Sequence, residues 1–188
     1  MKPRISPAEP PYAPEIKATL DRVMPAGVAP LILFTTLARN PRVFARFMAG
    51  GLLDKGSITL REREIIIDRT CARCGSEYEW GVHTALFAEK VGFTPAHLAA
   101  TAHGAGDDPI WDAREQLILR TADELHETSS ISDGLWAALN GAFSDEQILE
   151  LVALAGFYHT VSYLTNALRL PLERYAARFP GRSGDMLR

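Results

Sequence analysis

The sequence predicts an all-α fold, a single-domain bundle of about eight helices. Three observations predict it. Apolar residues recur at i, i+3, i+4 spacing, most of these runs follow a Ser or Thr that can cap a helix, and no stretch alternates apolar and polar residues over a full strand. A chain of 188 residues also suits one domain, because domains most often contain about 100–150 residues.

The first fourteen residues are expected to be extended rather than helical. Five of them are proline, and a proline fixes its own φ and disfavours helical backbone in the residue before it. Helices are expected almost throughout the rest of the chain.

Two long helices are predicted to meet at Gly75. The first lies in "TLREREIIIDRTCARCG", where Thr59 and Glu62 have the spacing of a capping box and the glycine fits the C-terminal stop. The second lies in "EYEWGVHTALFAEKV", and Ser76 and Glu79 repeat the capping-box spacing at its start.

Four further helices are predicted downstream. A Thr-Pro pair caps the segment that follows Gly92, "WDAREQLILRTADELHET" has helical apolar spacing, and "SDGLWAALNGAF" begins with a Ser cap. The last helix begins with Ser144 and Gln147 at capping-box spacing, and Pro171 ends it. Because it is apolar almost all round, we expect it to be buried in the core or in an oligomer interface.

Composition disfavours several classes of partner. The net charge of -3 gives no reason to expect nucleic acid or an acidic membrane surface. The N-terminus has no apolar region of a signal peptide, and no run reaches the roughly 18 apolar residues of a membrane span. We therefore expect a cytoplasmic protein whose two cysteines are free thiols.

Three segments carry a resemblance to a known family: "REREIII", "GSEYEWGVH" and "GFYHTVSYLTNALRLP". Over roughly residues 30 to 172 the chain resembles the carboxymuconolactone decarboxylase family, which includes the alkylhydroperoxidase D-like proteins. The resemblance implies an alkylhydroperoxidase D-like helical fold, chemistry without a cofactor and a homo-oligomer, a trimer or a hexamer. It divides the chain into a proline-rich N-terminal segment (1–29), a carboxymuconolactone decarboxylase-like domain (30–172) and a C-terminal tail (173–188).

The active-site signature of that family is a glutamate on one helix, then a Gly-Cys-x-Tyr-Cys-x-x-x-His segment that opens the next. Glu64, Gly75, Tyr78 and His83 match its glutamate, glycine, tyrosine and histidine at intact spacing. The resemblance therefore implies that Glu64 and His83 belong to an active site.

The cysteines of the chain depart from this signature. Its two cysteine positions hold Ser76 and Glu79, whereas Cys71 and Cys74 lie five residues upstream, near the C-terminal end of a helix. There the helix macrodipole opposes a thiolate. The resemblance is thus to a "YEWxxH" subgroup nearer the decarboxylase branch. A thiol antioxidant of the alkylhydroperoxidase or peroxiredoxin kind that uses the two cysteines, and a non-catalytic oligomeric member of the family, are the alternatives.

The candidate catalytic residues are His83, Glu79, Glu64 and His159. Glu79 and His83 lie four apart on one helix face, so the carboxylate can raise the pKa of the imidazole, although Glu79 could instead be only a capping residue. Glu64 could instead belong to a solvated helix face, and His159 could be a buried core histidine.

Three further residues are candidates for substrate binding. Tyr78 and Trp80 could line a pocket, although aromatic residues near a helix start are more often core, and Asn166 could donate to a substrate oxygen. No nucleotide-binding motif is present, and His97, His103 and His126 are expected at the surface. Glu64, Glu79, His83 and His159 have donor types that suit a metal, but we expect no metal and no cofactor.

The expected activity is that of a carboxy-lyase. The resemblance implies cofactor-free decarboxylation, or related proton-transfer chemistry, on a small carboxylated lactone or oxo acid. His83 would be the general acid, with Glu79 paired to it and Glu64 orienting it. An isomerase, a cyclase or a dehydratase could use the same Glu-His pair.

Overall fold

The computed structural model describes residues 2–25 and 27–181. Within these residues it contains nine helices and no strand, which confirms the all-α fold with one helix more than expected. The helices are α1 (Pro14–Val23), α2 (Ile32–Leu37), α3 (Pro41–Ala49), α4 (Leu60–Arg73), α5 (Glu77–Phe87), α6 (Pro95–His103), α7 (Ala113–Thr128), α8 (Asp133–Ala142) and α9 (Asp145–Leu168).

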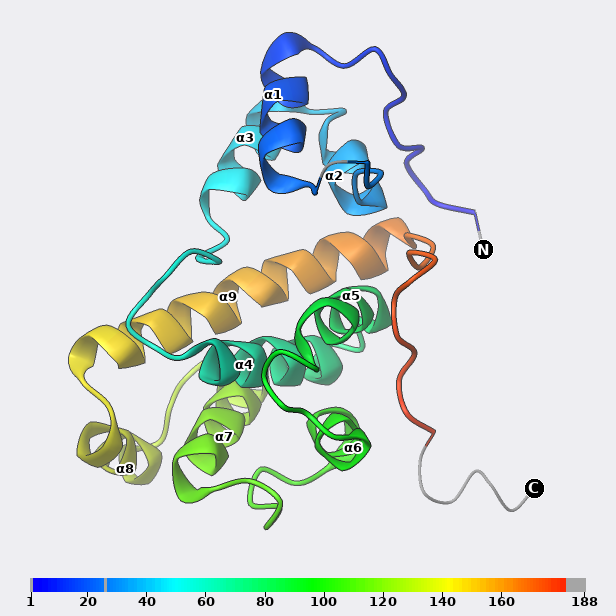
Figure 1. The fold of residues 1–188 in the computed structure, drawn as a ribbon. Coiled ribbons are helices and arrows are strands. Elements are labelled where there is room, and N and C mark those ends of the chain that lie inside the picture. The colour runs from blue at the N-terminus through cyan, green and yellow to red at the C-terminus, as the bar shows by residue number, and fades with distance from the viewer. Residues whose placement is uncertain (1, 26, 182–188) are drawn as a thin grey trace.

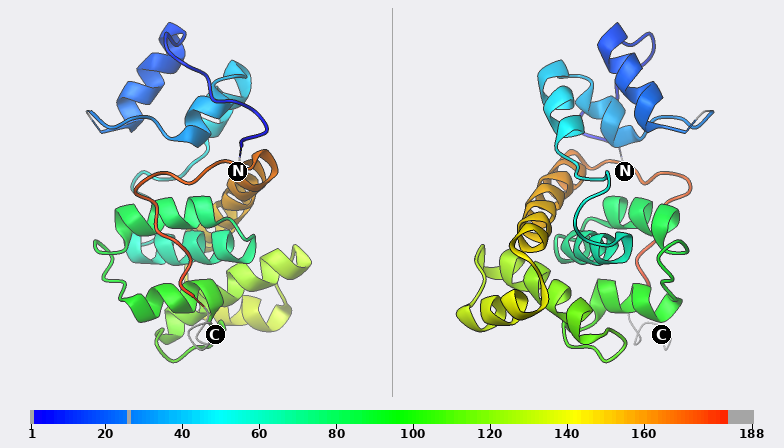
Figure 2. Two further views of the ribbon diagram at one scale, coloured as in Figure 1. Left: turned by 90° about the vertical axis from the view of Figure 1, so that its right-hand side faces the viewer. Right: turned by 60° about the vertical axis from the view of Figure 1, so that its left-hand side comes forward.

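The helices form two groups (Figure 1). In the larger group α4 lies at the centre and packs against α5, α6, α7 and α9. The short helices α1, α2 and α3 form the second group on one side of this bundle, as the two views of Figure 2 also show. The elements that carry the candidate site residues, α4, α5 and α9, therefore meet inside the larger group.

Helix α4 is buried on nearly all sides. It begins with the predicted capping box, in which Glu62 N donates to Thr59 Oγ1 (3.2 Å) and Thr59 N donates to Glu62 Oε2 (2.7 Å). The run 65–67 consists of three isoleucines with 0% of their surface exposed. The chain leaves the helix at Gly75, whose φ of 64° is left-handed backbone that glycine adopts without a steric penalty.

Helix α9 packs one stripe of its surface onto the bundle. Its buried residues recur every three or four positions: Ile148, Leu151, Leu154, Ala155, Tyr158, Val161, Ser162 and Thr165. Among the described residues α9 is the one helix long and apolar enough to cross a membrane, and 44% of its apolar window is buried inside the protein. The core helix of a soluble protein has the same properties.

Helix α5 begins at the expected place without the expected cap. Ser76 is its N-cap residue, but the serine side chain makes no capping hydrogen bond. Instead the Ser76 hydroxyl is 2.8 Å from the Thr165 hydroxyl of α9, in a buried contact. The predicted capping box of Ser76 and Glu79 is therefore wrong, because α9 provides the serine with another partner and Glu79 lies against His83.

The C-terminal segment up to residue 181 packs along α5. Ala177 N donates to Gly81 O (3.0 Å), and a Cβ added at Gly81 would lie 2.2 Å from Ala177 O. Phe179 packs on Trp80 with the ring centroids 5.0 Å apart. Glycine at position 81 therefore lets the segment approach α5 closely enough for this hydrogen bond.

Candidate active site around His83

Three polar side chains surround the buried imidazole of His83. The Nδ1 atom of His83 is 2.7 Å from Glu64 Oε2, and its Nε2 atom is 3.0 Å from the Tyr158 hydroxyl and 3.5 Å from Glu79 Oε1. His83 is 4% exposed, and Glu64 and Tyr158 are each 1% exposed. The structure thus brings three predicted catalytic residues, Glu64, Glu79 and His83, into one hydrogen-bonded network.

The side chains of the network come from three helices, and the helical repeat places them on the faces that meet. Glu79 and His83 lie four apart on α5, which places them on one face of that helix. Glu64, Asp68 and Cys71 lie on one face of α4, at spacings of four and three. Tyr158 projects from the buried stripe of α9.

An arginine completes the network on the far side of Glu64. Arg63 donates from Nε (2.9 Å) and Nη2 (2.8 Å) to Glu64 Oε1, so the two oxygens of this carboxylate bind different cations. Arg63 Nη1 donates to Leu53 O (2.9 Å) in the loop between α3 and α4. Arg63 therefore links the buried network to a loop at the surface.

The surroundings of His83 favour its protonated form. Burial opposes the charge and lowers the pKa, but hydrogen bonds and charge interactions with Glu64 and Glu79 outweigh burial and raise the pKa to about 10. Burial raises the pKa of Asp68 well above its usual range, and the neighbouring carboxylates act in the same direction. Two basic side chains, Arg63 and His83, thus lie against the carboxylates of Glu64 and Glu79 inside the protein.

We expect the stability of the protein to fall as the pH rises from about 6.5 to about 10. The pKa of His83 is raised from 6.5 to about 10 in the folded state. The stabilisation from its protonated form is therefore fully present below the unfolded pKa and is lost as the pH passes through the folded pKa. Urea unfolding at several pH values checks this. The free energy of unfolding of His83→Gln should depend less on pH than that of the wild type, and parallel curves would contradict the assignment.

Two polar atoms of the network make no hydrogen bond within the described part of the chain. Glu79 Oε2 and Asp68 Oδ1 are buried and have no hydrogen-bond partner among the described residues. Buried polar atoms are nearly always hydrogen-bonded to protein, water or a ligand. The network therefore offers acceptors, or a donor where Asp68 is protonated, to a further molecule.

The surface has two hollows, and neither of them exposes His83. A hollow of about 250 Å³ is lined by Arg63 together with Leu53, Lys55 and neighbours of the α3–α4 loop. A larger hollow of about 730 Å³ lies between the C-terminal end of α4 and α6. Neither is lined by His83, Glu79 or Tyr158, so the smaller hollow reaches the network through Arg63.

The remaining predicted site residues lie elsewhere. His159 does not join the network, because it neighbours Tyr163, with 3.5 Å between Nδ1 and the hydroxyl, and His126, with ring centroids 5.2 Å apart. Asn166 Nδ2 donates to Cys74 O (2.9 Å). Glu64, Glu79, His83 and His159, whose donor types would suit a metal, are therefore not brought together as one group of ligands.

The polar atoms of Tyr78 and Trp80, the two aromatic candidates, form hydrogen bonds with other parts of the protein. The Tyr78 hydroxyl donates to Glu173 Oε1 (2.5 Å) and accepts from Leu33 N (3.1 Å), and burial followed by the contact with Glu173 raises its pKa. Trp80 Nε1 donates to Thr101 Oγ1 (3.1 Å). A role for Tyr78 and Trp80 in substrate binding stays a prediction.

Sequence reasoning misses Tyr158, Arg63 and Asp68. It selects His159 and passes over the neighbouring tyrosine, because α9 is apolar all round and its buried face is not obvious. The signal that finds Tyr158 is the stripe of three- and four-residue spacings on α9, to which position 158 belongs and position 159 does not. Arg63 and Asp68 carry no such signal, since charged residues of a helix are usually solvated.

The fold is that of the all-helical proteins of the alkylhydroperoxidase D-like kind. The structure is similar to that of an uncharacterized peroxidase-related protein from Silicibacter sp. TM1040, with 19% identity, a TM-score of 0.79, and coverage of 96% of this chain and 99% of that chain. A second similar structure is the alkylhydroperoxidase AhpD core of an uncharacterized peroxidase-related protein from Ralstonia eutropha JMP134, with 22% identity, a TM-score of 0.77, and coverage of 90% and 93%.

A third similar structure is the debrominase Bmp8 in complex with 2,3,4-tribromopyrrole, with 14% identity, a TM-score of 0.76, and coverage of 93% of this chain and 94% of that chain. At such identities the likeness establishes the fold alone. The model of the Carboxymuconolactone decarboxylase family matches residues 39–124, a stretch that contains Glu64, Glu79 and His83. No curated protein matches the chain in sequence.

Proposed function

We propose that the protein is a cofactor-free decarboxylase of the carboxymuconolactone decarboxylase type, acting on a small carboxylated lactone or oxo acid. The observation that carries the proposal is the buried imidazole of His83, held by Glu64 at Nδ1 and facing Tyr158 and Glu79 at Nε2. A buried imidazole with a fixed orientation and a proton at each nitrogen is suited to general acid catalysis.

The reaction requires a general acid that protonates a carbon atom of the substrate. When the substrate carboxylate leaves as carbon dioxide, the electron pair of the broken C–C bond passes into the conjugated carbonyl and forms a dienolate. His83 then transfers its Nε2 proton through the Tyr158 hydroxyl to the dienolate carbon, and solvent returns a proton to the imidazole. No electron is gained or lost overall, so the reaction needs no redox partner.

The neighbours of His83 have separate roles in this proposal. Glu64 holds the ring through Nδ1 and stabilises its positive charge, as Arg63 holds Glu64 in turn. Tyr158, 3.0 Å from Nε2, relays the proton by accepting it on the hydroxyl oxygen while donating its own. Glu79, 3.5 Å from Nε2, keeps the proton donor protonated between turnovers.

The hollow beside Arg63 has a volume that suits a small substrate. Its volume is about 250 Å³, below the roughly 300–1,000 Å³ of sites for drug-sized ligands. Its lining includes the basic side chains of Arg63 and Lys55 and the carboxylates of Asp54 and Glu150. An anion that binds Arg63 there approaches Glu64 and the buried network from the surface.

The surroundings of the thiols weigh against peroxide chemistry. Cys71 is 0% exposed, and burial raises the pKa of its thiol well above the usual range. Burial also raises the pKa of Cys74, which is the C-cap residue of α4, where the macrodipole opposes a thiolate. Both thiols are therefore protonated at neutral pH, whereas a peroxidase needs a thiolate.

The test is turnover of a panel of small carboxylated lactones and oxo acids, followed as carbon dioxide release in metal-chelated buffer. We expect the wild type to consume at least one of them, and His83→Gln to be slower by at least about a hundredfold, the low end for general acid catalysis. The control is His103→Gln, since His103 is an exposed histidine of α6 and should turn over normally.

Three outcomes would overturn the proposal. Wild-type turnover by His83→Gln would remove His83 from the mechanism. Consumption of peroxide with a dithiol reductant, lost in Cys71→Ser or Cys74→Ser, would instead establish a thiol peroxidase. Failure to consume any member of the panel or peroxide would favour a non-catalytic member of the family.

A further inference from the structure

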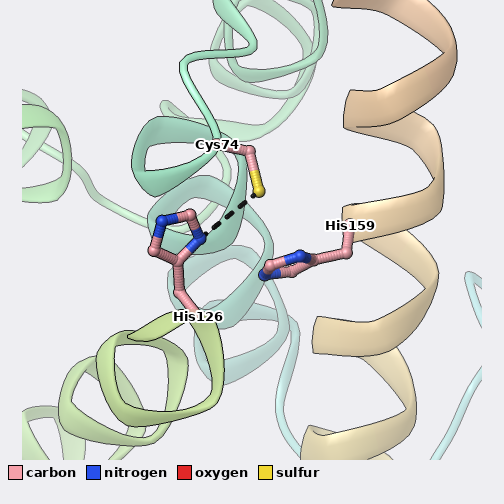
Figure 3. Close-up of side chains that lie close together, drawn as sticks. All are labelled: Cys74, His126 and His159. Carbon is pink, nitrogen blue, oxygen red and sulfur yellow. Dashed lines mark hydrogen bonds between the residues drawn. The ribbon is translucent and has the colours of Figure 1, made fainter. Parts of the chain in front are cut away.

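Three side chains with metal-ligating atoms meet outside the His83 network (Figure 3). Cys74 is the C-cap residue of α4, His126 lies in the last turn of α7, and His159 lies in the middle of α9. Their ligating atoms all lie within 4.8 Å of one another. The three residues come from positions 52 and 33 residues apart in the sequence, so only the packing of α4, α7 and α9 brings them together.

We propose that Cys74, His126 and His159 bind one zinc-type divalent ion, with water in a fourth position. A thiolate and two imidazoles form a donor set that suits zinc and its neighbours in the first transition row, and not magnesium or calcium, which prefer oxygen. Three protein ligands and one open position are the arrangement of zinc sites that keep a place for water or substrate.

The distances fit an ion of this kind. Zinc lies about 2.3 Å from a thiolate sulfur and about 2.0–2.1 Å from an imidazole nitrogen, so in a tetrahedral site the sulfur and the nitrogen lie about 3.6 Å apart. Cys74 Sγ lies 3.7 Å from His126 Nδ1. The sulfur and the nitrogen of this pair therefore already have the separation that a shared ion requires. A ring nitrogen of His159, the third ligand, lies within 4.8 Å of both atoms.

Neighbouring groups hold the ligands in place. Asn166 Nδ2 donates to Cys74 O (2.9 Å), which ties the end of α4 to α9. His159 Nδ1 lies 3.5 Å from the Tyr163 hydroxyl, which leaves Nε2 for an ion. Outer contacts of this kind orient the ligands in metal sites.

The local charge and exposure are compatible with a bound cation. Arg73 precedes Cys74, but its guanidinium pairs with Glu127 and with Asp123 (3.4 Å), so its positive charge is compensated. All three ligands are partly exposed, which gives water access to the fourth position. Binding of zinc would convert the thiol of Cys74 to a thiolate and release a proton to solvent.

This site is separate from the proposed decarboxylase chemistry. It uses none of Glu64, Glu79 and His83, and it includes His126, which the sequence places at the surface. It also departs from the sequence-based expectation that the protein binds no metal.

The test is a titration of the reduced, metal-free full chain with cobalt(II), which substitutes for zinc and reports its ligands by absorption. We expect one cobalt per chain, a thiolate-to-cobalt charge-transfer band in the near ultraviolet, the visible bands of a tetrahedral complex, and loss of these bands on addition of zinc. Cys74→Ser should abolish the charge-transfer band, and His126→Ala and His159→Ala should each weaken cobalt binding at least about tenfold.

The controls are Cys71→Ala and His103→Ala, which remove a cysteine and a histidine outside the cluster and should leave cobalt binding unchanged. Circular dichroism checks that every variant is folded. The three ligand side chains are partly exposed, and three independent variants are available if one fails to fold. Cobalt binding without a charge-transfer band, equal binding by Cys74→Ser and the wild type, or no binding at all would overturn the proposal.

Discussion

Replacing Glu64 by Gln is expected to lower the free energy of unfolding at neutral pH by about 3–5 kcal/mol, the cost of removing one partner from a buried ion pair. Glu64 is 1% exposed, and its two oxygens bind two different cations, Arg63 and His83. A glutamine keeps the shape of the side chain and loses the charge. Both cations would then lie in the interior without the carboxylate that compensates them.

The same change is expected to lower the pKa of His83. Hydrogen bonding to Glu64 is the largest of the contributions that raise this pKa against burial. Without it the imidazole loses its proton more readily, which removes one uncompensated charge and limits the loss of stability as the pH rises. Urea unfolding measures the first effect, and titration of the His83 ring protons by NMR measures the second.

The matched control is Glu89→Gln, an exposed glutamate next to the end of α5. It should change stability by less than about 0.5 kcal/mol, as surface substitutions do. If Glu64→Gln were equally mild and the pKa of His83 were unchanged, the network described here would not hold the imidazolium.

Replacing Asp123 by Asn is expected to lower the free energy of unfolding by about 3 kcal/mol, within the range for a buried hydrogen-bonded charge pair. Arg69 of α4, with its side chain 4% exposed, donates from Nε (2.7 Å) and Nη2 (2.8 Å) to the two oxygens of Asp123 of α7. Its Nη1 donates to Thr101 O (3.1 Å) near the end of α6. Loss of the carboxylate would leave the guanidinium buried and unpaired at the junction of three helices.

A double variant separates the charge effect from the packing. Arg69→Met combined with Asp123→Leu removes both charges and should cost less than Asp123→Asn alone, because no buried charge is left. The exposed pair of Lys17 and Asp21, 2.6 Å apart with side chains 64% and 61% exposed, is the control. Asp21→Asn should cost at most about 0.5 kcal/mol. Equal costs for Asp21→Asn and Asp123→Asn, measured by urea unfolding, would contradict the role assigned to Arg69.

Helix boundaries were predictable where the signal lies within one turn. The capping boxes of Thr59 with Glu62 and of Ser144 with Gln147 form as expected, and the chain turns at Gly75 with a positive φ. Each of these depends on residues at most three apart. Ser76 has the same pattern and no capping hydrogen bond, because Thr165, far away in the sequence, offers its hydroxyl a partner.

Part of the candidate site was predictable for a similar reason. Spacing along one helix places Glu79 beside His83, and the family resemblance points to Glu64, which the structure places 2.7 Å from His83. Tyr158 was not predictable from its residue type, because either of two neighbouring residues on an apolar helix could face the site. Only the packing of α9 selects Tyr158 and turns His159 away.

The sequence by itself determined the six helices α4 to α9 and the pairing of His83 with Glu79, since these depend on short-range hydrogen bonds and on the helical repeat. The tertiary structure decided which side chains share a buried environment. It placed Arg63 against Glu64, raised the pKa of Asp68 by burial, and brought together Cys74, His126 and His159 from three helices. Such contacts depend on the rotation and crossing of packed helices, to which residues throughout the chain contribute, and no local pattern of residues records them.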